Sequence, residues 1–440
     1  MNKRVLIITY YWPPAGGGGV QRWVKFVKYL RSFGWEPIVF TVENGEYPII
    51  DNTIGKEIPD DIEILRAPII EPYTWYRRLT GKKKDSKIDP NFLSQGKKLT
   101  LKDKIAVWIR GNFFIPDARV LWVGSATKVI SSYMQNHHVD AIISTGPPHT
   151  CHLIAEKIKQ KYHLPWIVDY RDPWTQIDFF EDLGLTQWAR KRHVRMEKRI
   201  LDHCDAIITV GKTMATDLEY ITSNRNRVVI TNGFDESDRP KTQATLDSEF
   251  SITYIGTMND ARNPLLLWET LATLKQENHE MIRHLKVKLV GKPEPIVRQS
   301  INEHQIEELV QFCGYVAHDE AISFQNKARV LLLMINNTSN NRSILTGKIF
   351  EYMASGRPIL CIGPKDGDAA DILQESGFSS VYDYQDKEGL KAYLKQQFDD
   401  YMHGVGSSPT VANNINQYSR KSLTGKLATV LNQIQTQTQK

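Results

Sequence analysis

Two short stretches of the sequence combine residue types that could hold a phosphorylated ligand. Residues 16–19 are four consecutive glycines, and Lys348 and Glu351 stand three positions apart within Thr346-Gly347-Lys348-Ile349-Phe350-Glu351. Glycines at the start of a helix leave backbone N–H groups open to a phosphate or sugar oxygen. Residues three apart share a helical face, so Lys348 can neutralise a diphosphate while Glu351 accepts hydrogen bonds from ribose hydroxyls. A flexible turn and a surface ion pair are the respective alternatives.

The glycine run does not complete a dinucleotide-binding fingerprint. That pattern needs a third glycine at a fixed spacing, where this chain has Gln21 or Arg22, depending on which glycine starts the pattern. Glu43 stands roughly where a ribose-binding acid would lie. One matching acid does not replace the missing glycine, so a dinucleotide-dependent oxidoreductase remains only a weaker alternative.

Apolar, strand-like runs alternate with helix-like segments along the whole chain. Strands are expected at residues 5–9, 37–42, 62–65, 139–144, 166–169, 206–210 and 228–231, and again at 251–255, 287–290, 309–312, 330–335 and 358–362. Such alternation predicts two doubly wound parallel sheets in tandem. We expect a first domain at 1–235, a linker at 236–249, a second domain at 250–412 and a helix within 413–440.

Residues that directly follow the apolar runs are candidates for a binding site, because ligands of open parallel sheets gather beyond the carboxyl ends of the strands. In the first half these are His149 and, after the next run, Asp169, Arg171 and Asp172. In the second half they are Gly256, Thr257, Arg262, Gly314, Tyr315 and Val316. A structural salt-bridge cluster at 169–172 and a turn or helix cap at His149 are the alternatives.

These motifs together resemble the retaining nucleotide-sugar glycosyltransferases of family 4, of the bacterial surface-polysaccharide type, which have the GT-B fold. The resemblance spans nearly the whole chain and rests on Pro13-Pro14 with the glycine run, Pro147-Pro148-His149, residues 169–174 and 231–235, Ile255-Gly256, residues 314–316 and 348–358, and Tyr418-Ser419-Arg420. It implies two facing Rossmann-like domains with an interdomain cleft. The first domain would bind the acceptor, the second the donor, and the helix within 413–440 would pack back on the first.

The resemblance also implies roles for individual residues. Arg262 and Lys348 would stabilise the departing diphosphate, and His149 would contact the transferred sugar. The donor-binding residues would be Gly16, Gly17, Gly18, Gly19, Gly256, Thr257, Gly314, Tyr315, Val316, Ser343, Thr346, Gly347 and Glu351, and the acceptor side would be lined by Asp169, Arg171 and Asp172. Glu351 matches the second of two family glutamates separated by seven residues, but the first is replaced here by Ser343.

The implied activity is that of a hexosyltransferase (EC 2.4). It would move a sugar from a nucleoside-diphosphate sugar, such as a UDP-sugar, to a membrane-associated glycan or lipid-linked acceptor with retention of configuration, in surface polysaccharide or glycoconjugate biosynthesis. Attack from the leaving-group face needs no carboxylate nucleophile, unlike retaining glycosidases. No cofactor and no metal are expected, because no clustered ligand set is present. A GT-B-fold nucleotide-sugar epimerase remains an alternative.

Composition predicts a globular protein of two ordinary domains, with 440 residues of which 41% are hydrophobic and 24% charged. No apolar run approaches the length of a bilayer span, so a cytoplasmic location is expected. The four cysteines, Cys151, Cys204, Cys313 and Cys361, are scattered and lack CxxC spacing. Buried core thiols are therefore expected rather than disulfides or a zinc site.

The net charge of +6 is concentrated locally. Between Arg77 and Arg110, eleven lysine or arginine residues oppose three aspartates. Interleaved aromatic and aliphatic residues make segment 77–114 suited to an anionic membrane surface at the inner face of the cell membrane; a solvated insertion is the alternative. A second basic stretch, 190–199, accompanies Trp188, Ala189, Met196, Ile200 and Cys204 at a spacing that predicts one core-facing side. No nucleic-acid motif accompanies either stretch, so nucleic acid is not an expected partner.

Overall fold

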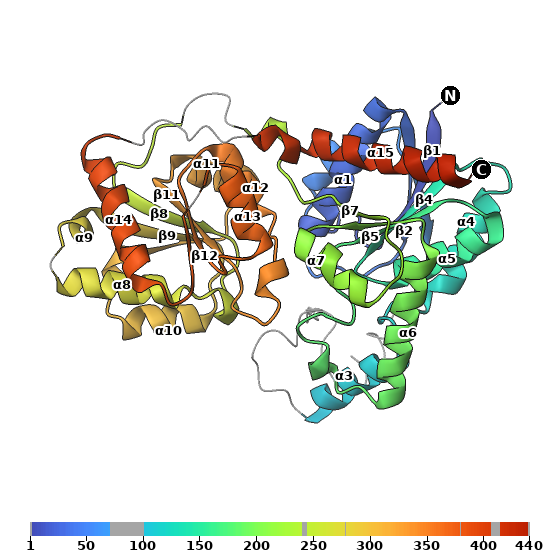
Figure 1. The fold of residues 1–440 in the computed structure, drawn as a ribbon, viewed down its shortest axis with the longest axis horizontal. Coiled ribbons are helices and arrows are strands. Elements are labelled where there is room, and N and C mark those ends of the chain that lie inside the picture. The colour runs from blue at the N-terminus through green and yellow to red at the C-terminus, as the bar shows by residue number, and fades with distance from the viewer. Residues whose placement is uncertain are drawn as a thin grey trace. The chain divides into compact units, whose positions relative to one another are not determined.

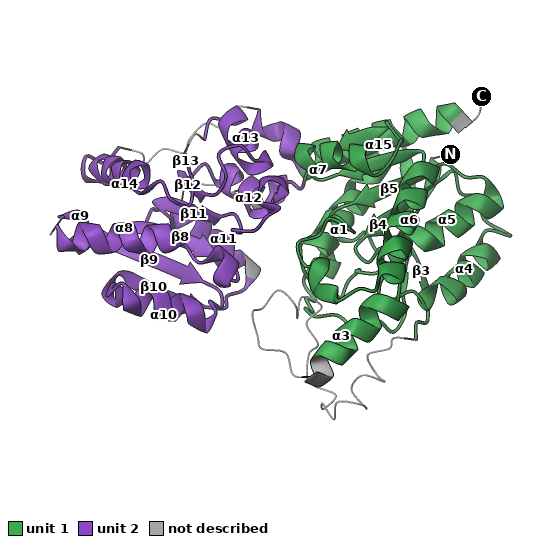
Figure 2. Cartoon of the chain, turned by 60° about the horizontal axis from the view of Figure 1, so that its bottom comes forward, with its two compact units in different colours: residues 1–231, 420–440 green, residues 232–419 purple. Residues whose placement is uncertain are grey.

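The computed structural model describes residues 2–70, 101–239, 244–277, 279–378, 380–405 and 414–438. The chain forms two compact units, unit 1 with residues 1–231 and 420–440 and unit 2 with residues 232–419 (Figure 2). The chain therefore passes between the units twice. The two passing segments pair with each other, because Phe234 forms a β-bridge with Ser419 and its N–H donates to the Tyr418 carbonyl at 3.2 Å.

Unit 1 is built on a parallel sheet of seven strands in the order β3-β2-β1-β4-β5-β6-β7 (Figure 1). The strands are β1 (Lys3–Ile8), β2 (Trp35–Val42), β3 (Glu63–Ala67), β4 (Ala141–Gly146), β5 (Trp166–Tyr170), β6 (Ala206–Thr209) and β7 (Arg227–Val229). In the centre of the sheet, Leu6 of β1 lies opposite Ile38 of β2 on one side and Ile142 of β4 on the other. All seven strands expected in this half are confirmed.

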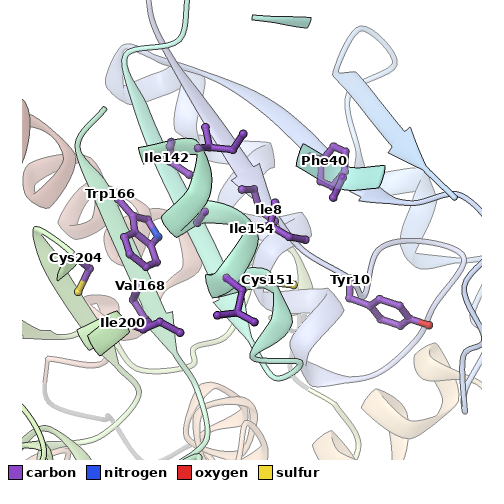
Figure 3. Packing of buried hydrophobic residues seen from close by; sticks show 14 of the residues in the cluster. Ile8, Tyr10, Phe40, Ile142, Cys151, Ile154, Trp166, Val168, Ile200 and Cys204 are labelled. Atoms are coloured by element: carbon purple, nitrogen blue, oxygen red, sulfur yellow. The ribbon is translucent and has the colours of Figure 1, made fainter. Parts of the chain in front are cut away.

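Helices cover both faces of this sheet. They are α1 (Gly18–Leu30), α3 (Leu101–Phe113), α4 (Trp122–Tyr133), α5 (Thr150–Tyr162), α6 (Gln187–His203), α7 (Lys212–Asp217) and α15 (Arg420–Thr438). Successive strand residues point to opposite faces, so Leu6 and Ile8 pack with α4, α5 and α6, whereas Val5 and Ile7 pack with α1 and α15. Figure 3 shows Ile8 in the first of these clusters, together with Ile154 of α5 and Ile200 of α6.

The C-terminal helix belongs to unit 1, as the sequence predicted. Leu427 and Leu431 of α15 are fully buried in the same apolar cluster as Val24 and Val27 of α1. The helix lies against α1 (Figure 1). The end of the chain thus completes one face of the first sheet.

Unit 2 repeats the architecture with a parallel sheet of six strands in the order β10-β9-β8-β11-β12-β13. The strands are β8 (Phe250–Ile255), β9 (Leu285–Val290), β10 (Val310–Gly314), β11 (Val330–Met334), β12 (Ile359–Ile362) and β13 (Val381–Tyr382). The helices are α8 (Leu265–Gln276), α9 (Met281–His284), α10 (Pro295–Glu303), α11 (His318–Lys327), α12 (Lys348–Ser355), α13 (Asp368–Glu375) and α14 (Lys387–Met402). Helices α8, α10 and α14 bury one face, and α12 and α13 the other. The two-residue β13 was not predicted, because no apolar run marks it.

Both sheets have the doubly wound strand order that reverses direction beside the first strand. The reversal falls between β1 and β4 in unit 1 and between β8 and β11 in unit 2. In open parallel sheets ligands bind at such a point, outside the carboxyl ends of the strands. The loops after these four strands are therefore where a ligand of either unit is expected.

The predicted linker, 236–249, belongs to unit 2 and does not separate the two units. Its described residues lie in unit 2, where the Asp247 N–H donates to the Lys327 carbonyl at 2.9 Å and Lys288 pairs with Asp247 and Glu249 at 3.0 and 2.9 Å. The division between the units lies at residue 231 rather than 235. Residues 77–100 of the predicted membrane segment lie outside the described residues, and residues 101–113 form α3.

The cysteine prediction holds in most respects. All four thiols are free, and Cys151, Cys204 and Cys361 are buried, whereas Cys313 at the end of β10 is only half-buried. Within the described ranges, no helix is long and apolar enough to cross a bilayer.

Candidate functional site

The four glycines after β1 have different structural tasks. Gly16 packs against residues 49–51, since its N–H donates to the Ile49 carbonyl at 2.9 Å and an added Cβ would lie 2.9 Å from Ile49 Cγ2. Gly17 has a φ of +105°, which disfavours other residues, and Gly18 begins α1 with open space around its Cα. The first amides of a helix have no intrahelical acceptor. The start of α1 therefore presents N–H groups without side chains.

Gly19 is the point at which the glycine loop meets the loop after β5. A Cβ at this position would overlap the Arg171 guanidinium. Arg171 is held there because its Nη2 donates to the Pro147 carbonyl at 2.7 Å. Three candidate segments of unit 1, the loops after β1, β4 and β5, thus converge on one cation.

Asp169 is a structural hub rather than an exposed acid. It is fully buried and accepts hydrogen bonds from Arg22 Nη2 at 2.9 Å, Trp23 Nε1 at 2.9 Å and Thr145 Oγ1 at 2.8 Å. Arg22 is equally buried and also donates to the Thr231 and Ile230 carbonyls. This carboxylate has no surface left for an acceptor, which argues against the predicted direct contact. Asp172, by contrast, is exposed.

His149 is a buried, neutral imidazole at the start of α5. Burial, reinforced by the Arg171 guanidinium and by His193, lowers the pKa of His149 to about 3. Its ring stacks on Trp174 with centroids 4.8 Å apart, and its Nδ1 is buried without a hydrogen-bond partner. It stands at the N-cap position of α5 but makes no side-chain cap hydrogen bond. The alternative that His149 is a helix cap is therefore correct for its position, but its side chain does not cap the helix.

The N-terminus of α5 is already occupied by an acid of the chain itself. Thr150 donates from its N–H to Asp117 Oδ2 at 2.9 Å and from its hydroxyl to Asp117 Oδ1 at 2.8 Å. A negative charge at a helix N-terminus is favourable. Of the two helices that begin at the switch point of unit 1, only α1 leaves its first turn to a ligand.

A buried network holds the stacked ring of Trp174 in place. Trp174 Nε1 donates to His193 Nδ1 at 2.9 Å, and His193 Nε2 contacts the Gly111 carbonyl of α3 at 3.3 Å. Glu197 of α6 accepts hydrogen bonds from the hydroxyls of Tyr170 and Thr175 on either side of this loop. Burial raises the pKa of Glu197. Helix α6 thus fixes the loop that carries Arg171 and the ring beneath His149.

In unit 2, three glycines lie at the carboxyl ends of neighbouring strands of the sheet. Gly256, Gly291 and Gly314 follow or end β8, β9 and β10, and all three have positive φ values, of +126°, +132° and +73°. The Gly256 N–H donates to the Val290 carbonyl, and the Gly291 N–H to the Gly314 carbonyl, both at 2.7 Å. These three positions therefore add no side chain of their own at the edge of the sheet.

Lys348 and Arg262 bring two positive charges to this surface. A Cβ on Gly256 would lie 2.5 Å from Lys348 Nζ, and that Nζ lies 5.2 Å from the centre of the Tyr254 ring. Arg262 Nε donates to Asn336 Oδ1 at 2.7 Å, a bond that links the loops after β8 and β11. Burial, and then the Arg262 charge, lower the pKa of Lys348 to about 8, against a smaller opposing effect of Glu351. Two cations at a switch point, opposed by only a smaller effect of Glu351, are suited to an anionic ligand.

The loop before α12 is organised around its own backbone. Thr346 Oγ1 accepts from the Lys348 N–H at 3.2 Å, and Ser343 donates from its hydroxyl to the Asn340 carbonyl at 2.9 Å. Tyr352 accepts from the Ile255 N–H at 3.2 Å and so fixes α12 to the end of β8. Glu351, in the first turn of α12, is half-buried. Local contacts therefore hold α12 in place, with Lys348 beside Gly256.

The remaining predicted donor residues lie at the same edge but are more exposed. Tyr315 is 81% exposed after β10, and Thr257 is exposed after β8. The structure thus places the predicted residues in two groups, one at the carboxyl edge of each sheet. The donor-binding roles of Thr257, Gly314, Tyr315 and Val316 stay predictions.

Sequence reasoning missed several residues that shape these groups: Arg22, His193, Glu197, Tyr254 and Asn336. Asn336 directly follows the predicted strand 330–335, so the strand-end rule applied there would have found it. The others gave no local signal, because each acts through a partner far away in the sequence. In the part of the chain that the structure describes, no three His, Cys, Asp or Glu side chains are grouped so as to hold a metal ion.

Residues 249–400, within unit 2, match the family model described as Glycosyl transferases group 1. No curated protein sequence matches the chain significantly.

Among solved structures, sucrose-phosphate synthase from Thermosynechococcus elongatus is similar with a TM-score of 0.63 and 13% identity, covering 98% of this chain and 99% of that chain. A glycosyltransferase from Rickettsia africae has a TM-score of 0.61 and 15% identity, covering 98% of both chains. A variant of TarM from S. aureus, solved with UDP and alpha-GlcNAc-glycerol, has a TM-score of 0.58 and 12% identity, covering 98% of this chain and 100% of that chain.

A protein described as a UDP-N-acetylglucosamine 2-epimerase from Listeria monocytogenes is less similar, with a TM-score of 0.51 and 11% identity, covering 98% of this chain and 96% of that chain. Identities this low show a shared fold and not a shared substrate. The two parallel-sheet domains and their structural neighbours confirm the predicted GT-B fold, and the family match over unit 2 supports a glycosyltransferase.

Proposed function

We propose that the chain is a retaining glycosyltransferase that moves a sugar from a nucleoside-diphosphate sugar to a membrane-associated glycan or lipid-linked acceptor, in the synthesis of a surface polysaccharide or glycoconjugate. The observation that carries the proposal is the position of Lys348. Its ammonium lies over Gly256 beside Arg262, at the switch point of the unit that matches the group 1 glycosyl transferases.

In the proposed donor complex, Lys348 and Arg262 bind the diphosphate. As the bond to the sugar breaks, negative charge grows on the leaving phosphate, and cations already in place stabilise that charge without reorganisation. The lowered pKa of Lys348 fits this role, because an anion that arrives nearby restores the charged form. Glu351 is proposed to accept hydrogen bonds from the ribose hydroxyls.

Unit 1 is proposed to contact the sugar and the acceptor. His149 is neutral at physiological pH, so its role is that of a hydrogen-bond partner of a sugar hydroxyl and not that of a charged acid. The N–H groups at the start of α1 and the Arg171 guanidinium supply positive potential beside it. The acceptor hydroxyl would attack on the face that the diphosphate leaves, so no carboxylate nucleophile is required. No metal is assigned a role in this proposal.

The decisive assay incubates the protein with a panel of nucleoside-diphosphate sugars and a lipid-linked acceptor, and measures both the released nucleoside diphosphate and the anomeric configuration of the product by NMR. Acceptor-dependent release with a retained configuration supports the proposal. An inverted product contradicts the retaining mechanism, and an epimerised nucleotide sugar without transfer identifies an epimerase instead.

Donor binding by Glu351 is tested separately from turnover. Glu351→Ala should weaken nucleoside-diphosphate binding while the unfolding transition stays in place. Glu388, which occupies the first turn of α14, provides a matched control, because Glu388→Ala changes the charge equally away from the site. Unchanged affinity in Glu351→Ala would remove this residue from the donor site.

A further inference from the structure

Two buried imidazole nitrogens near the start of α5 make no hydrogen bond to the described residues. They are Nδ1 of His149, at the N-cap of the helix, and Nε2 of His152, in its first turn. A Cβ on Gly146, the last residue of β4, would lie 3.0 Å from the first nitrogen and 2.5 Å from the second. The two nitrogens are therefore at most 5.5 Å apart, the sum of these distances. Polar atoms at such a separation can bond through one water molecule, or directly when they are closer.

These two nitrogens need each other as partners. A buried polar atom that makes no hydrogen bond costs free energy, so such atoms are normally paired with protein groups or with buried water. Burial keeps both rings neutral, since it lowers the pKa of His149 to about 3 and the pKa of His152 well below its usual value. A neutral imidazole has one N–H donor and one acceptor nitrogen. The two nitrogens can therefore pair as one donor and one acceptor.

Ser144 of β4 decides which nitrogen of His152 carries the proton. Trp166 Nε1 donates to Ser144 Oγ at 2.8 Å, and this Oγ lies 2.8 Å from His152 Nδ1. All three side chains are fully buried. An indole N–H can only donate, so Ser144 accepts from Trp166 and keeps its own proton for another acceptor. In the part of the chain that the structure describes, that acceptor is His152 Nδ1, which leaves the ring proton on Nε2, the nitrogen near His149.

The other nitrogen of His149 is the one that a ligand can reach. Nε2 of His149 also makes no hydrogen bond to the described residues, but unlike Nδ1 it is not shut off from solvent. If Nδ1 accepts from His152, the proton of the His149 ring lies on Nε2. The series of hydrogen bonds that begins at Trp166 then ends on an N–H that is open to a ligand.

We propose that His152 is a positioning residue, whose Nε2–H donates to His149 Nδ1, directly or through one water molecule, and so fixes His149 as a hydrogen-bond donor toward the transferred sugar. The sugar as ligand rests on the proposed function. The direction of the hydrogen bond is new: His149 Nε2 donates, and a sugar oxygen accepts. Gly146 has a role in this arrangement, because a Cβ there would lie against both nitrogens.

The alternative is that His152 only fills the core. Its ring stacks on Tyr170 with centroids 6.3 Å apart, and a phenylalanine could make that contact equally well. Packing depends on the shape of the ring, whereas positioning depends on a proton at Nε2. Variants that keep the shape or keep the donor therefore separate the two roles.

The 15N NMR spectrum of the unliganded, histidine-labelled protein tests the proposal without any sugar transfer. The shift of a ring nitrogen reports whether it carries a proton and, if not, whether it accepts a hydrogen bond. We expect the His149 proton on Nε2 and an Nδ1 resonance typical of an acceptor. His152→Phe should move this resonance to that of an unbonded nitrogen, whereas His152→Gln, whose amide nitrogen can donate from about the same place, should keep most of the shift. Ser144→Ala should move it partway, because the His152 proton is then no longer held on Nε2.

Turnover in the transfer assay gives a second measurement. His152→Phe should lower kcat about fivefold, the contribution of one neutral hydrogen bond, and His152→Gln should recover most of it. The Kd of the nucleoside diphosphate, which lacks the sugar, should change less than twofold in both. Ser251→Ala is a control, because it removes another fully buried strand hydroxyl, one that accepts from the Arg329 N–H in unit 2; the His149 resonances should not change in it. Circular dichroism and thermal unfolding verify the folding of every variant.

The proposal is overturned if the wild-type Nδ1 of His149 carries the proton or has the shift of an unbonded nitrogen, or if a folded His152→Phe leaves its resonance unchanged. Equal losses of kcat in His152→Phe and His152→Gln also overturn it, because the donor would then be irrelevant. The NMR result needs no activity. An Nδ1 resonance that responds to His152 in a protein without transferase activity would therefore refute the proposed function alone.

Discussion

Binding of the nucleoside diphosphate should weaken as the pH rises above 8, because the ammonium of Lys348 then loses its proton. Burial and the charge of Arg262 lower the pKa of this lysine to about 8 in the unliganded protein. Lys348 is therefore about nine-tenths charged at pH 7 and about one-tenth charged at pH 9. If only the charged form binds the diphosphate well, the association constant falls about tenfold between these pH values, or about 1.4 kcal/mol.

Isothermal titration calorimetry at pH 7, 8 and 9 measures this change directly. At pH 8 about half of the unliganded molecules lack the proton, so binding should take up about half a proton. Titrations in buffers of different ionisation enthalpy report that number. Lys348→Met is the control, because it removes the charge, keeps most of the aliphatic length and retains every other titrating group of the protein and ligand.

Raising the pH should weaken ligand binding but should stabilise the unliganded protein against unfolding. The folded pKa of Lys348 lies below its unfolded value of 10.5, so the unfolded state binds more protons between about pH 8 and that value. The free energy of unfolding should therefore rise with pH across this window, relative to Lys348→Met.

For ligand binding, an equal pH profile of nucleotide affinity in wild type and variant, or an affinity that increases with pH, would refute the reasoning.

Three further substitutions test other parts of the account. Gly256→Ala should reduce nucleoside-diphosphate affinity at least tenfold, measured by calorimetry, since a Cβ there is strained at φ +126° and displaces the lysine. Gly124→Ala, in α4 of unit 1 with open space around its Cα, should leave the affinity unchanged. Arg22→Met should lower the free energy of unfolding by about 3 kcal/mol in urea titrations, because it leaves a buried carboxylate unpaired, whereas Arg4→Met in a half-exposed pair should cost less than about 1 kcal/mol. His149→Ala should lower turnover more than donor affinity in steady-state and binding assays, and a variant at the wild-type rate removes that role.

Much of the fold could be predicted because its causes are local. Buried parallel strands are short apolar runs with turn residues after them, and twelve such runs became strands. Strand β13 is only two residues long, Val381–Tyr382, and its pairing with β12 is decided by the sheet and not by its own sequence. The likeness of the two units followed from the same alternation of strands and helices.

The candidate site was predictable where its residues are neighbours in the sequence. Lys348 and Glu351 share one turn of α12, so their common face followed from spacing alone. Asp169 shows the limit of prediction from neighbouring residues, because its hydrogen-bond donor Arg22 lies 147 positions away in the sequence. Trp188 shows another, because helical spacing grouped it with the buried Ala189 although Trp188 itself is 58% exposed.

The glycine run combines both situations. Its place before a helix was evident, but only the three-dimensional structure separates Gly16, which packs on residues 49–51, from Gly19, which makes room for Arg171. No periodic pattern distinguishes a glycine required by packing from one required by a ligand.

The central claim, that unit 2 binds a nucleoside diphosphate through Lys348, is tested most directly by calorimetric titration with UDP, GDP, ADP and NAD at pH 7. The account predicts that at least one nucleoside diphosphate binds to one site per chain and that Lys348→Met weakens this binding at least tenfold. It also predicts that the wild type binds NAD no more tightly than Lys348→Met binds that nucleoside diphosphate. Tight binding of NAD with none of the three diphosphates, or diphosphate binding that Lys348→Met leaves unchanged, would contradict it.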